Sequence, residues 1–388
     1  MKRYLSLDVL RGMTVAFMCI VNNPGTWGKM YAPLKHAPWE GCTPTDLVYP
    51  FFLFCAGCAM AFSFSKFNGL DGAAVKKIVR RGLLIFLVGF LCNLYPFFPT
   101  QPDPELSFWQ NWVDWIGGKR IFGVLQRIGL SYMIAGLIAM WLRKPAKILS
   151  AIAVLSIVYT GILVIFGTEP GPFTLEGNIS GKIDVALLGD NHVYHGYTND
   201  LGQRIAFDPE GPLGAMMGAC TALLGFIVGS LILNSGKKYQ ADSTDAHNSP
   251  LGVSCRILVC GLLSLAFAEI LSIWIPISKA LWSASYVFLA GGWSMVVLGV
   301  LAYFIDYKGI TRPFTMFKIM GTNALTAFVM SAVIAKTMSM LLHTGPSKFF
   351  GGFFTQNEFT SLLWALTFML IIFCIQYALY RKKIIIKL

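Results

Sequence analysis

The sequence predicts an all-α protein, a polytopic integral membrane helix bundle of about ten or eleven transmembrane helices. Hydrophobic residues make up 55% of the 388 residues and charged residues only 13%. The mean hydropathy is +0.62. The 30 Phe, 14 Tyr and 10 Trp would leave more apolar surface than a water-soluble fold can bury, whereas lipid tolerates it. This composition excludes a soluble enzyme, a disordered chain and a collagen-like repeat.

Ten apolar runs are long enough to cross a hydrocarbon layer of roughly 30 Å. They cover residues 5–21, 47–64, 82–98, 121–142, 148–166, 212–233, 253–275, 281–305, 316–342 and 359–380. The first run is short, and the ninth is long enough to contain a break or a second short helix. We predict one membrane-embedded domain over residues 1–388, made of a six-helix half 1–234, a polar cytoplasmic linker 235–252 and a four-helix half 253–388.

The distribution of basic residues predicts the orientation in the membrane. With both termini cytoplasmic, the inner segments hold 20 Lys and Arg and the outer segments 8, while Arg11, Arg127 and Lys336 fall inside predicted spans. This bias explains the net charge of +12 without a nucleic-acid partner. Although the start imitates a signal peptide, Asp8 and Arg11 interrupt its apolar run and no cleavage pattern follows, so we expect a retained first helix.

Charged groups inside a bilayer are costly, so each needs a partner or a function. Asp8 and Arg11 are three residues apart on the first helix, where two roles fit. They form a structural ion pair, or Arg11 meets an anionic ligand that enters from the cytoplasm. Arg127, with Gln126, lies near the outer end of the fourth predicted helix, where at least one of the two should face a polar cavity.

Two further patterns have both a structural and a functional interpretation. The sixth helix contains the spacings Gly214-x-x-x-Gly218 and Gly225-x-x-x-Gly229, which favour close helix packing within the chain and also permit a dimer contact. Just before it, Asp208-Pro209-Glu210 either caps the helix or recognises a cationic substrate group. The long outer segments 99–120 and 168–211 are expected to form an extracytoplasmic cap.

The richest polar segment, residues 21–57, contains His36 in an outer loop. One imidazole with amide and carboxylate neighbours suits a general base or a nucleophile near neutral pH. A loop histidine is also commonly just solvated. The neighbours of His36 include two amides that end the first helix and aromatic and acidic residues further along: Asn22, Asn23, Trp39, Glu40 and Asp46.

Five segments in order along the chain carry a resemblance to a known family. They are Leu-Ser-Leu-Asp-Val-Leu-Arg-Gly (5–12), His-Ala-Pro-Trp-Glu-Gly-Cys-Thr-Pro-Thr-Asp-Leu-Val-Tyr-Pro-Phe (36–51), Arg-Ile-Phe-Gly-Val-Leu-Gln-Arg (120–127), Phe-Asp-Pro-Glu-Gly (207–211) and Leu-Trp-Ser-Ala-Ser-Tyr (281–286). Together they resemble the catalytic region of the heparan-α-glucosaminide N-acetyltransferases. They are also similar to bacterial relatives in the transmembrane acyltransferase superfamily.

The resemblance implies acetyl-CoA as a cytoplasmic donor and a glucosamine-type amine as the acceptor on the far side. It also implies that His36 is the active-site residue, helped by an Asn at the end of the first helix, either Asn22 or Asn23. The expected catalytic residues are His36, Asn22, Asn23 and Asp46. Cations are needed for the CoA phosphates, and the expected donor-binding residues are Asp8, Arg11, Arg80, Arg81 and Arg127. A protonated amine is a cation that carboxylates can hold, and the expected acceptor-binding residues are Trp39, Glu40, Asp208 and Glu210.

The resulting hypothesis is an N-acetyltransferase that acts at the outer face of a bacterial-type inner membrane, without a metal. Its expected partners are an amino sugar or glycan end and membrane lipid, with a homodimer possible. His36 is either a general base or an acetyl-carrying nucleophile. Two alternatives stay open: an amino-sugar or N-acetylglucosamine permease, and an O-acyltransferase of an envelope glycan.

Overall fold

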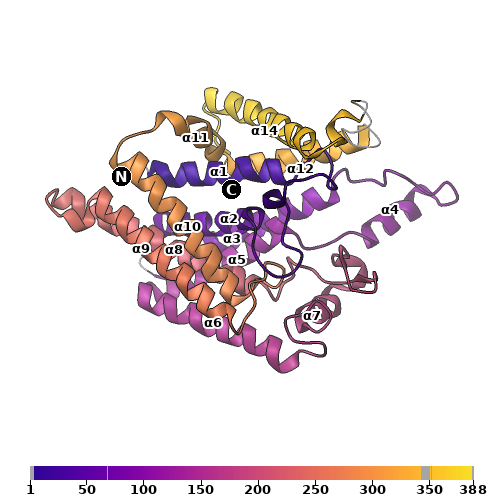
Figure 1. Cartoon of the computed structure of the whole chain (residues 1–388), viewed down its shortest axis with the longest axis horizontal. Helices are drawn as coiled ribbons and strands as arrows, with labels where there is room; N and C mark the ends of the chain where they lie inside the picture. Colours follow the sequence, from indigo (N-terminus) through magenta and orange to yellow (C-terminus); the bar gives the residue numbers. More distant parts are fainter. Residues whose placement is uncertain (1–3, 68, 342–349, 351, 387–388) are drawn as a thin grey trace.

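The structure is a computed structural model that describes residues 4–67, 69–341, 350 and 352–386. It is a bundle of long helices, as Figure 1 shows. The β-structure within the described residues is a two-stranded antiparallel ribbon, β1 (Tyr197–Thr198) with β2 (Arg204–Ile205), and one isolated bridge. The predicted all-α helix bundle is therefore confirmed.

Each of the ten predicted apolar runs overlaps a long helix. In chain order these are α1 (Leu5–Val21), α2 (Val48–Phe64), α3 (Gly72–Leu94), α5 (Val124–Leu142), α6 (Pro145–Phe166), α8 (Ala215–Ala241), α9 (Pro250–Ser272), α10 (Ala284–Leu301), α12 (Ala324–Leu341) and α14 (Glu358–Arg381). Helix α3 begins ten residues before its run, and α8 ends eight residues after its run. In the described part of the chain, eight helices are long and apolar enough to cross a membrane. The other two are α1, which has 17 residues, and α3, whose first half carries four basic residues.

The ninth run is broken, as its length suggested. It contains α11 (Thr315–Thr322) and α12, separated by Asn323 with φ −126° and ψ 50°. The Asn323 side chain donates to the carbonyl of Ile384 at 2.9 Å and accepts from the amide of Ile386 at 2.9 Å. The break therefore also holds the segment that follows α14. Leu342, the predicted end of this run, lies outside the described residues, as do Lys2, Arg3, Lys348 and Lys387 from the charge count.

The shorter helices α4 (Phe108–Gly117) and α7 (Ile179–Leu188) belong to the two predicted outer segments. In Figure 1 both lie at the end of the bundle away from the N-terminus. At the other end, the predicted linker 235–252 is shorter than expected. Helix α8 continues to Ala241 and α9 begins at Pro250, with one 3-10 turn, η4 (Ala246–Asn248), between them.

The glycines of α8 serve packing inside the chain. A Cβ on Gly225 would lie 2.1 Å from the carbonyl oxygen of Phe54 in α2, and a Cβ on Gly57 of α2 would lie 1.8 Å from the α8 backbone. Gly214 and Gly218 face side chains of α5 in the same way. The packing interpretation is confirmed. Because these glycines already contact α2 and α5, they offer no surface for a dimer.

Candidate active site

A pocket of about 560 Å³ lies at the end of the bundle that carries α7 and the β1–β2 ribbon. Five stretches of the chain form its wall: the loop before α2, Arg120 before α5, the segment around β1, Pro209 and Glu210 before α8, and the loop between α9 and α10. Its lining side chains include His36, Trp39, Asp46, Arg120, Tyr194, Tyr197, Glu210, Lys279 and Trp282. The expected extracytoplasmic segment 168–211 therefore supplies one wall.

His36 and Asp46 form a hydrogen-bonded pair in this wall. The Nδ1 atom of His36 lies 2.6 Å from Oδ1 of Asp46. Asp46 belongs to the 3-10 turn η2 (Pro44–Leu47), which leads into α2, and is only 1% exposed. Because a carboxylate only accepts hydrogen bonds, Nδ1 carries the proton and Nε2 keeps a free lone pair. The His36 side chain is 46% exposed, so this lone pair belongs to an accessible ring.

The second oxygen of Asp46 is held by its own turn. Oδ2 accepts from the backbone amides of Ala37 and Thr43, both at 3.0 Å, and from the Thr43 hydroxyl at 3.1 Å. This arrangement is a capping box at the start of η2. The same geometry leaves Oδ1 free to orient the imidazole. One residue thus starts the turn into α2 and positions His36.

Lys279 completes this cluster from the loop between α9 and α10. Its Nζ atom lies 3.3 Å from Oδ1 of Asp46 and 3.0 Å from Nδ1 of His36. Because an ammonium group only donates and Nδ1 already carries a proton, the favourable contact of Lys279 is the ion pair with Asp46. The amide of Gly41 donates to the carbonyl of Ile277 at 2.7 Å and ties the two loops together. Sequence reasoning missed Lys279, which is 243 residues from His36. The only local signal was its place two residues before the motif 281–286.

That motif forms a tight turn beneath the pocket. Trp282 has φ +53°, a left-handed conformation that is rare for a bulky side chain and costs on the order of 1–3 kcal/mol. The ring is 1% exposed, and its Nε1 donates to the Thr221 hydroxyl at 3.2 Å. The hydroxyl of Tyr286, four residues later, donates to the carbonyl of Asp46 at 2.6 Å. Packing therefore imposes the strained turn, which fixes both the pocket floor and the backbone of Asp46.

Aromatic rings form another side of the pocket. The Trp39 ring lies edge-on to Tyr197, with centroids 5.5 Å apart, and its Nε1 donates to the carbonyl of Phe173 at 2.7 Å. Tyr194 stacks edge-on to Tyr197 at 5.9 Å. Rings with polar edges suit a ligand that has both apolar faces and hydroxyl groups. Trp39 was expected at the acceptor site and does line the pocket, whereas the two tyrosines were not anticipated.

Arg120 pairs with both of the carboxylates that were expected to hold the acceptor. Its guanidinium donates to both oxygens of Asp208, at 2.8 and 2.5 Å, and to Glu210. Asp208 is fully buried at its side chain and accepts from the amide of Glu210 at 2.9 Å. Only Glu210 of the two lines the pocket. Asp208 is thus a positioning residue, and any contact between Glu210 and a cationic ligand competes with Arg120.

Arg127 lies beneath the pocket floor. Its guanidinium is 4.7 Å from the Trp282 ring and donates to the carbonyl of Pro209, and the residue is 1% exposed. Arg81 lies over the ring of Tyr132, 5.2 Å from its centroid. Tyr132 is five residues after Arg127 in α5, which corresponds to a helix rise of about 8 Å. The expected donor-binding cations are therefore distributed along α3 and α5. Gln126 donates to the carbonyl of Ile121 at 3.0 Å.

A buried carboxyl group that the sequence did not single out lies close by on α7. Asp184 is 0% exposed. Its burial and the negative charge of Asp208 raise the pKa of Asp184 to about 8. A carboxyl group that is mostly protonated at neutral pH is unusual, and such groups often mark functional sites.

Two other expected donor-binding residues form the ion pair that the sequence suggested. Nη2 of Arg11 lies 2.9 Å from Oδ1 of Asp8. Next to them, a Cβ on Gly12 would lie 1.7 Å from the carbonyl oxygen of Phe317, so α1 crosses α11 in direct backbone contact. The structural role of the pair is present. Arg80 is exposed in the first half of α3.

Three expected site residues are not brought to His36. Among the lining residues described, the pocket includes neither Asn22, Asn23 nor Glu40. Asn22 is the exposed C-cap of α1, and the Asn23 side chain donates to the carbonyl of Cys19 at 3.0 Å. Glu40 is exposed. The two asparagines terminate a helix, which is the physical reason that a polar pair stands there.

The sequence of the chain is similar to that of known proteins, and the match includes the residues that form the pocket. The profile of the family described as heparan-alpha-glucosaminide N-acetyltransferase, catalytic, matches residues 3–174. Over its entire length the chain is 28% identical to heparan-alpha-glucosaminide N-acetyltransferase of Mus musculus and 29% identical to that of Homo sapiens. The chain is therefore similar in sequence to the heparan-α-glucosaminide N-acetyltransferases. It spans 60% of the length of each of these two relatives. The resemblance expected from the five motifs is confirmed, and the family match includes both His36 and Asp46.

Proposed function

We propose that the chain transfers an acetyl group from acetyl-CoA to the amine of a glucosamine-type sugar at the extracytoplasmic side of a bacterial inner membrane. The observation that supports this most is the His36–Asp46 pair, at 2.6 Å, in the wall of an aromatic-lined pocket. The relationship to N-acetyltransferases supports the reaction class. Both termini would then be cytoplasmic, in accord with the bias of the basic residues.

In the proposed reaction, Nε2 of His36 removes a proton from the bound sugar ammonium group. The free amine attacks the carbonyl carbon of the thioester, so that a C–N bond forms while the C–S bond breaks. The departing CoA thiolate takes up the proton from His36, and the nitrogen, which is cationic after the attack, loses its second proton to water as the amide forms. Asp46 keeps the reactive tautomer and stabilises the imidazolium. A route in which Nε2 first accepts the acetyl group needs the same lone pair and the same Asp46 bond.

The donors that would stabilise the oxyanion differ from those expected. An oxyanion site needs a fixed donor that faces the reacting carbonyl. Because neither Asn22 nor Asn23 lines the pocket, this role passes to cationic groups of the wall. Lys279 and Arg120 are the candidates, since both line the pocket and both are held by carboxylates.

The acceptor would bind between the aromatic rings. Trp39, Tyr194 and Tyr197 offer apolar faces and polar edges, which suit a sugar ring. The ammonium group would approach Glu210 and His36. Because Arg120 already pairs with Glu210, the pocket holds little excess negative charge. Because the positive and negative charges of the pocket wall nearly cancel, the pocket does not strongly stabilise a permanent cation, which favours an acceptor whose ammonium group loses its proton before it reacts.

The donor would reach the pocket along α3 and α5. Arg80 and Arg81 lie in the first half of α3, and Arg127 lies at the pocket end of α5. Nε of Arg81 and both Nε and Nη2 of Arg127 are buried without a hydrogen-bond partner. Buried polar atoms of this kind need a ligand or water. Polar groups of a bound acetyl-CoA would form hydrogen bonds with these atoms of Arg81 and Arg127 along the path from the cytoplasmic face to Trp282.

The test is transfer from labelled acetyl-CoA to glucosamine by the purified protein in detergent. His36→Ala should abolish transfer and leave CoA binding unchanged. His195→Ala is the matched control, because His195 also pairs with a carboxylate, Asp190 at 3.3 Å, but does not line the pocket. Full activity of His36→Ala would end the proposal. Transfer to hydroxyl acceptors alone would assign an O-acyltransferase, and glucosamine uptake without transfer would assign a permease.

A further inference from the structure

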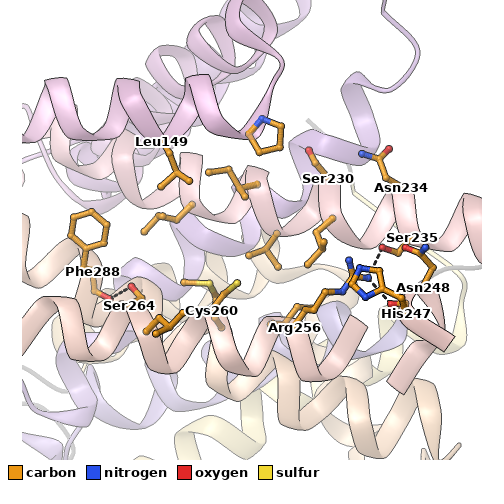
Figure 2. A pocket seen from close by; sticks show the side chains of 18 of the residues that line it. Leu149, Ser230, Asn234, Ser235, His247, Asn248, Arg256, Cys260, Ser264 and Phe288 are labelled. Atoms are coloured by element: carbon orange, nitrogen blue, oxygen red, sulfur yellow. Dashed lines mark hydrogen bonds between the residues drawn. The ribbon is translucent and has the colours of Figure 1, made fainter. Parts of the chain in front are cut away.

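A second pocket, of about 610 Å³, lies outside the candidate active site. We call it the α8 groove. Its floor is α8, its walls come from α6 and α9, and α10 and η4 close its ends. Figure 2 shows this groove from close by. None of its described lining residues belongs to the pocket that contains His36.

The α8 groove is polar at one end and apolar over the rest of its length. Figure 2 shows Asn234, Ser235, His247, Asn248 and Arg256 gathered at one end, with Lys238 also lining the groove. Cys260 and Phe288 lie further along, with apolar residues of α8 and α9 between and beyond them, including Leu231, Ile257, Leu263 and Phe267. The described lining contains no acidic residue. The polar end therefore carries net positive charge from Lys238 and Arg256.

Arg256 is held in place at this end by neutral groups. Its Nη2 donates to the Ser235 hydroxyl and to the carbonyl of His247, both at 2.9 Å, and its Nε donates to the carbonyl of Gly252 at 3.3 Å. None of these acceptors is a carboxylate, so the positive charge is not neutralised by them. Lys238 is exposed on the last turns of α8. Two cations, one of them fixed, match a phosphate group.

The length and the opening of the groove match one acyl chain. Arg256 and Phe267 are 11 residues apart on α9, which corresponds to about 16 Å, just over half of a roughly 30 Å hydrocarbon layer. The outer face of α9 is apolar and exposed, with Val259 55%, Leu262 58% and Leu263 65% exposed. Since Leu263 also lines the groove, the groove opens toward the face that would contact lipid.

We propose that the α8 groove binds one anionic phospholipid of the inner leaflet. Its phosphate lies between Lys238 and Arg256, and one acyl chain runs along α8 and α9 toward Phe267. The apolar lining and the opening toward lipid favour a phospholipid over a soluble nucleotide. Basic pockets between transmembrane helices on this side are typical sites for anionic headgroups.

The experiment is native mass spectrometry of the full chain, released from micelles with equal amounts of phosphatidylglycerol and phosphatidylcholine. We expect one retained phosphatidylglycerol per chain. Lys238→Gln should lower the preference for phosphatidylglycerol about fivefold, the factor that one basic residue contributes at an anionic surface. Lys237→Gln, its exposed neighbour outside the groove, is the matched control and should leave it unchanged. Leu231→Trp should fill the groove and reduce retention of both lipids.

Three results would overturn the proposal. The first is equal retention of the two lipids by the wild type. The second is an equal loss in the Lys237→Gln and Lys238→Gln variants, which would indicate a general surface charge effect. The third is displacement of phosphatidylglycerol by CoA or by a second copy of the chain, which would assign the groove to that occupant.

Discussion

Asp46→Asn tests the proposed mechanism most sharply, because it changes one atom and leaves the shape of the turn. Oδ2 of Asp46 accepts from Ala37 and Thr43, while Oδ1 faces His36 and Lys279. An asparagine must place its oxygen where those donors converge, so its NH₂ group takes the position of Oδ1. A donor there forces Nδ1 of His36 to accept, and the proton moves to Nε2. The ring then has no lone pair for the acceptor or for the acetyl group.

The expected loss follows from that change of tautomer. In serine proteases the same Asp-to-Asn change beside a catalytic histidine lowers kcat by about 10⁴. We expect a loss of about 10²–10⁴ in kcat/KM here, or about 3–5 kcal/mol of transition-state stabilisation. The free energy of unfolding should fall by only about 1–2 kcal/mol. The amides of Ala37 and Thr43 keep an oxygen acceptor in the asparagine, and their hydrogen bonds weaken only because that oxygen is no longer charged.

The assay is the kcat/KM for acetyl transfer to glucosamine, with thermal unfolding in the same detergent as the measure of folding. Asp190→Asn, which alters the exposed partner of His195, is the matched control and should keep wild-type activity. A folded Asp46→Asn protein with kcat/KM within a few-fold of the wild type would refute the reasoning. That result would mean that the His36–Asp46 bond does not set the reactive tautomer.

Three further outcomes follow from the structure. Burial raises the pKa of Asp184 to about 8, against about 4 in the unfolded chain. The contribution of the protonated carboxyl group to folding stability is therefore present below pH 4 and is lost as the pH rises through 8. The Tm should fall from pH 6 to pH 9, and Asp184→Asn should flatten that fall. Lys279→Met should reduce kcat/KM about tenfold or more while Lys279→Arg retains most of it, whereas equal loss in both would argue for a packing role. Gly225→Ala should destabilise the fold by about 1–3 kcal/mol, because the new Cβ would lie 2.1 Å from the α2 backbone. Gly236→Ala is the control in the same helix: a Cβ there meets nothing within 4 Å, so this change should stabilise the fold by about 0.5–1 kcal/mol. Similar effects of the two substitutions on the Tm would contradict the packing explanation.

The helices were predictable because length and apolarity are local properties of a stretch of chain. All ten apolar runs overlap a long helix, and the polar Asn323 marks the break in the ninth. Helix ends were less predictable. Helix α8 continues through a polar stretch to Ala241, because a helix can leave the apolar layer without a signal that stops it.

The candidate site was predictable only in part. His36 and Asp46 were both expected, and they are only ten residues apart, joined through one turn. Asp208 and Glu210 were expected at the acceptor, but nothing local shows that Arg120, 88 residues from Asp208, pairs with them. Asn22 and Asn23 have the residue type that an oxyanion site needs. They stand at the end of α1, where the Asn23 side chain bonds to the carbonyl of Cys19, and neither is among the described residues that line the pocket.

The sequence by itself determined that the protein is built for a membrane, which segments are apolar enough to cross it, and which stretch carries His36 and its polar neighbours, since each of these depends on composition or on near neighbours. Only the tertiary structure decided which charges meet. Lys279 reaches Asp46 because a loop 243 residues beyond His36 is tied to Gly41 by a backbone hydrogen bond. Electrostatic interactions depend on distances of a few ångströms, and helix packing, here through glycines of α2 and α8, sets those distances.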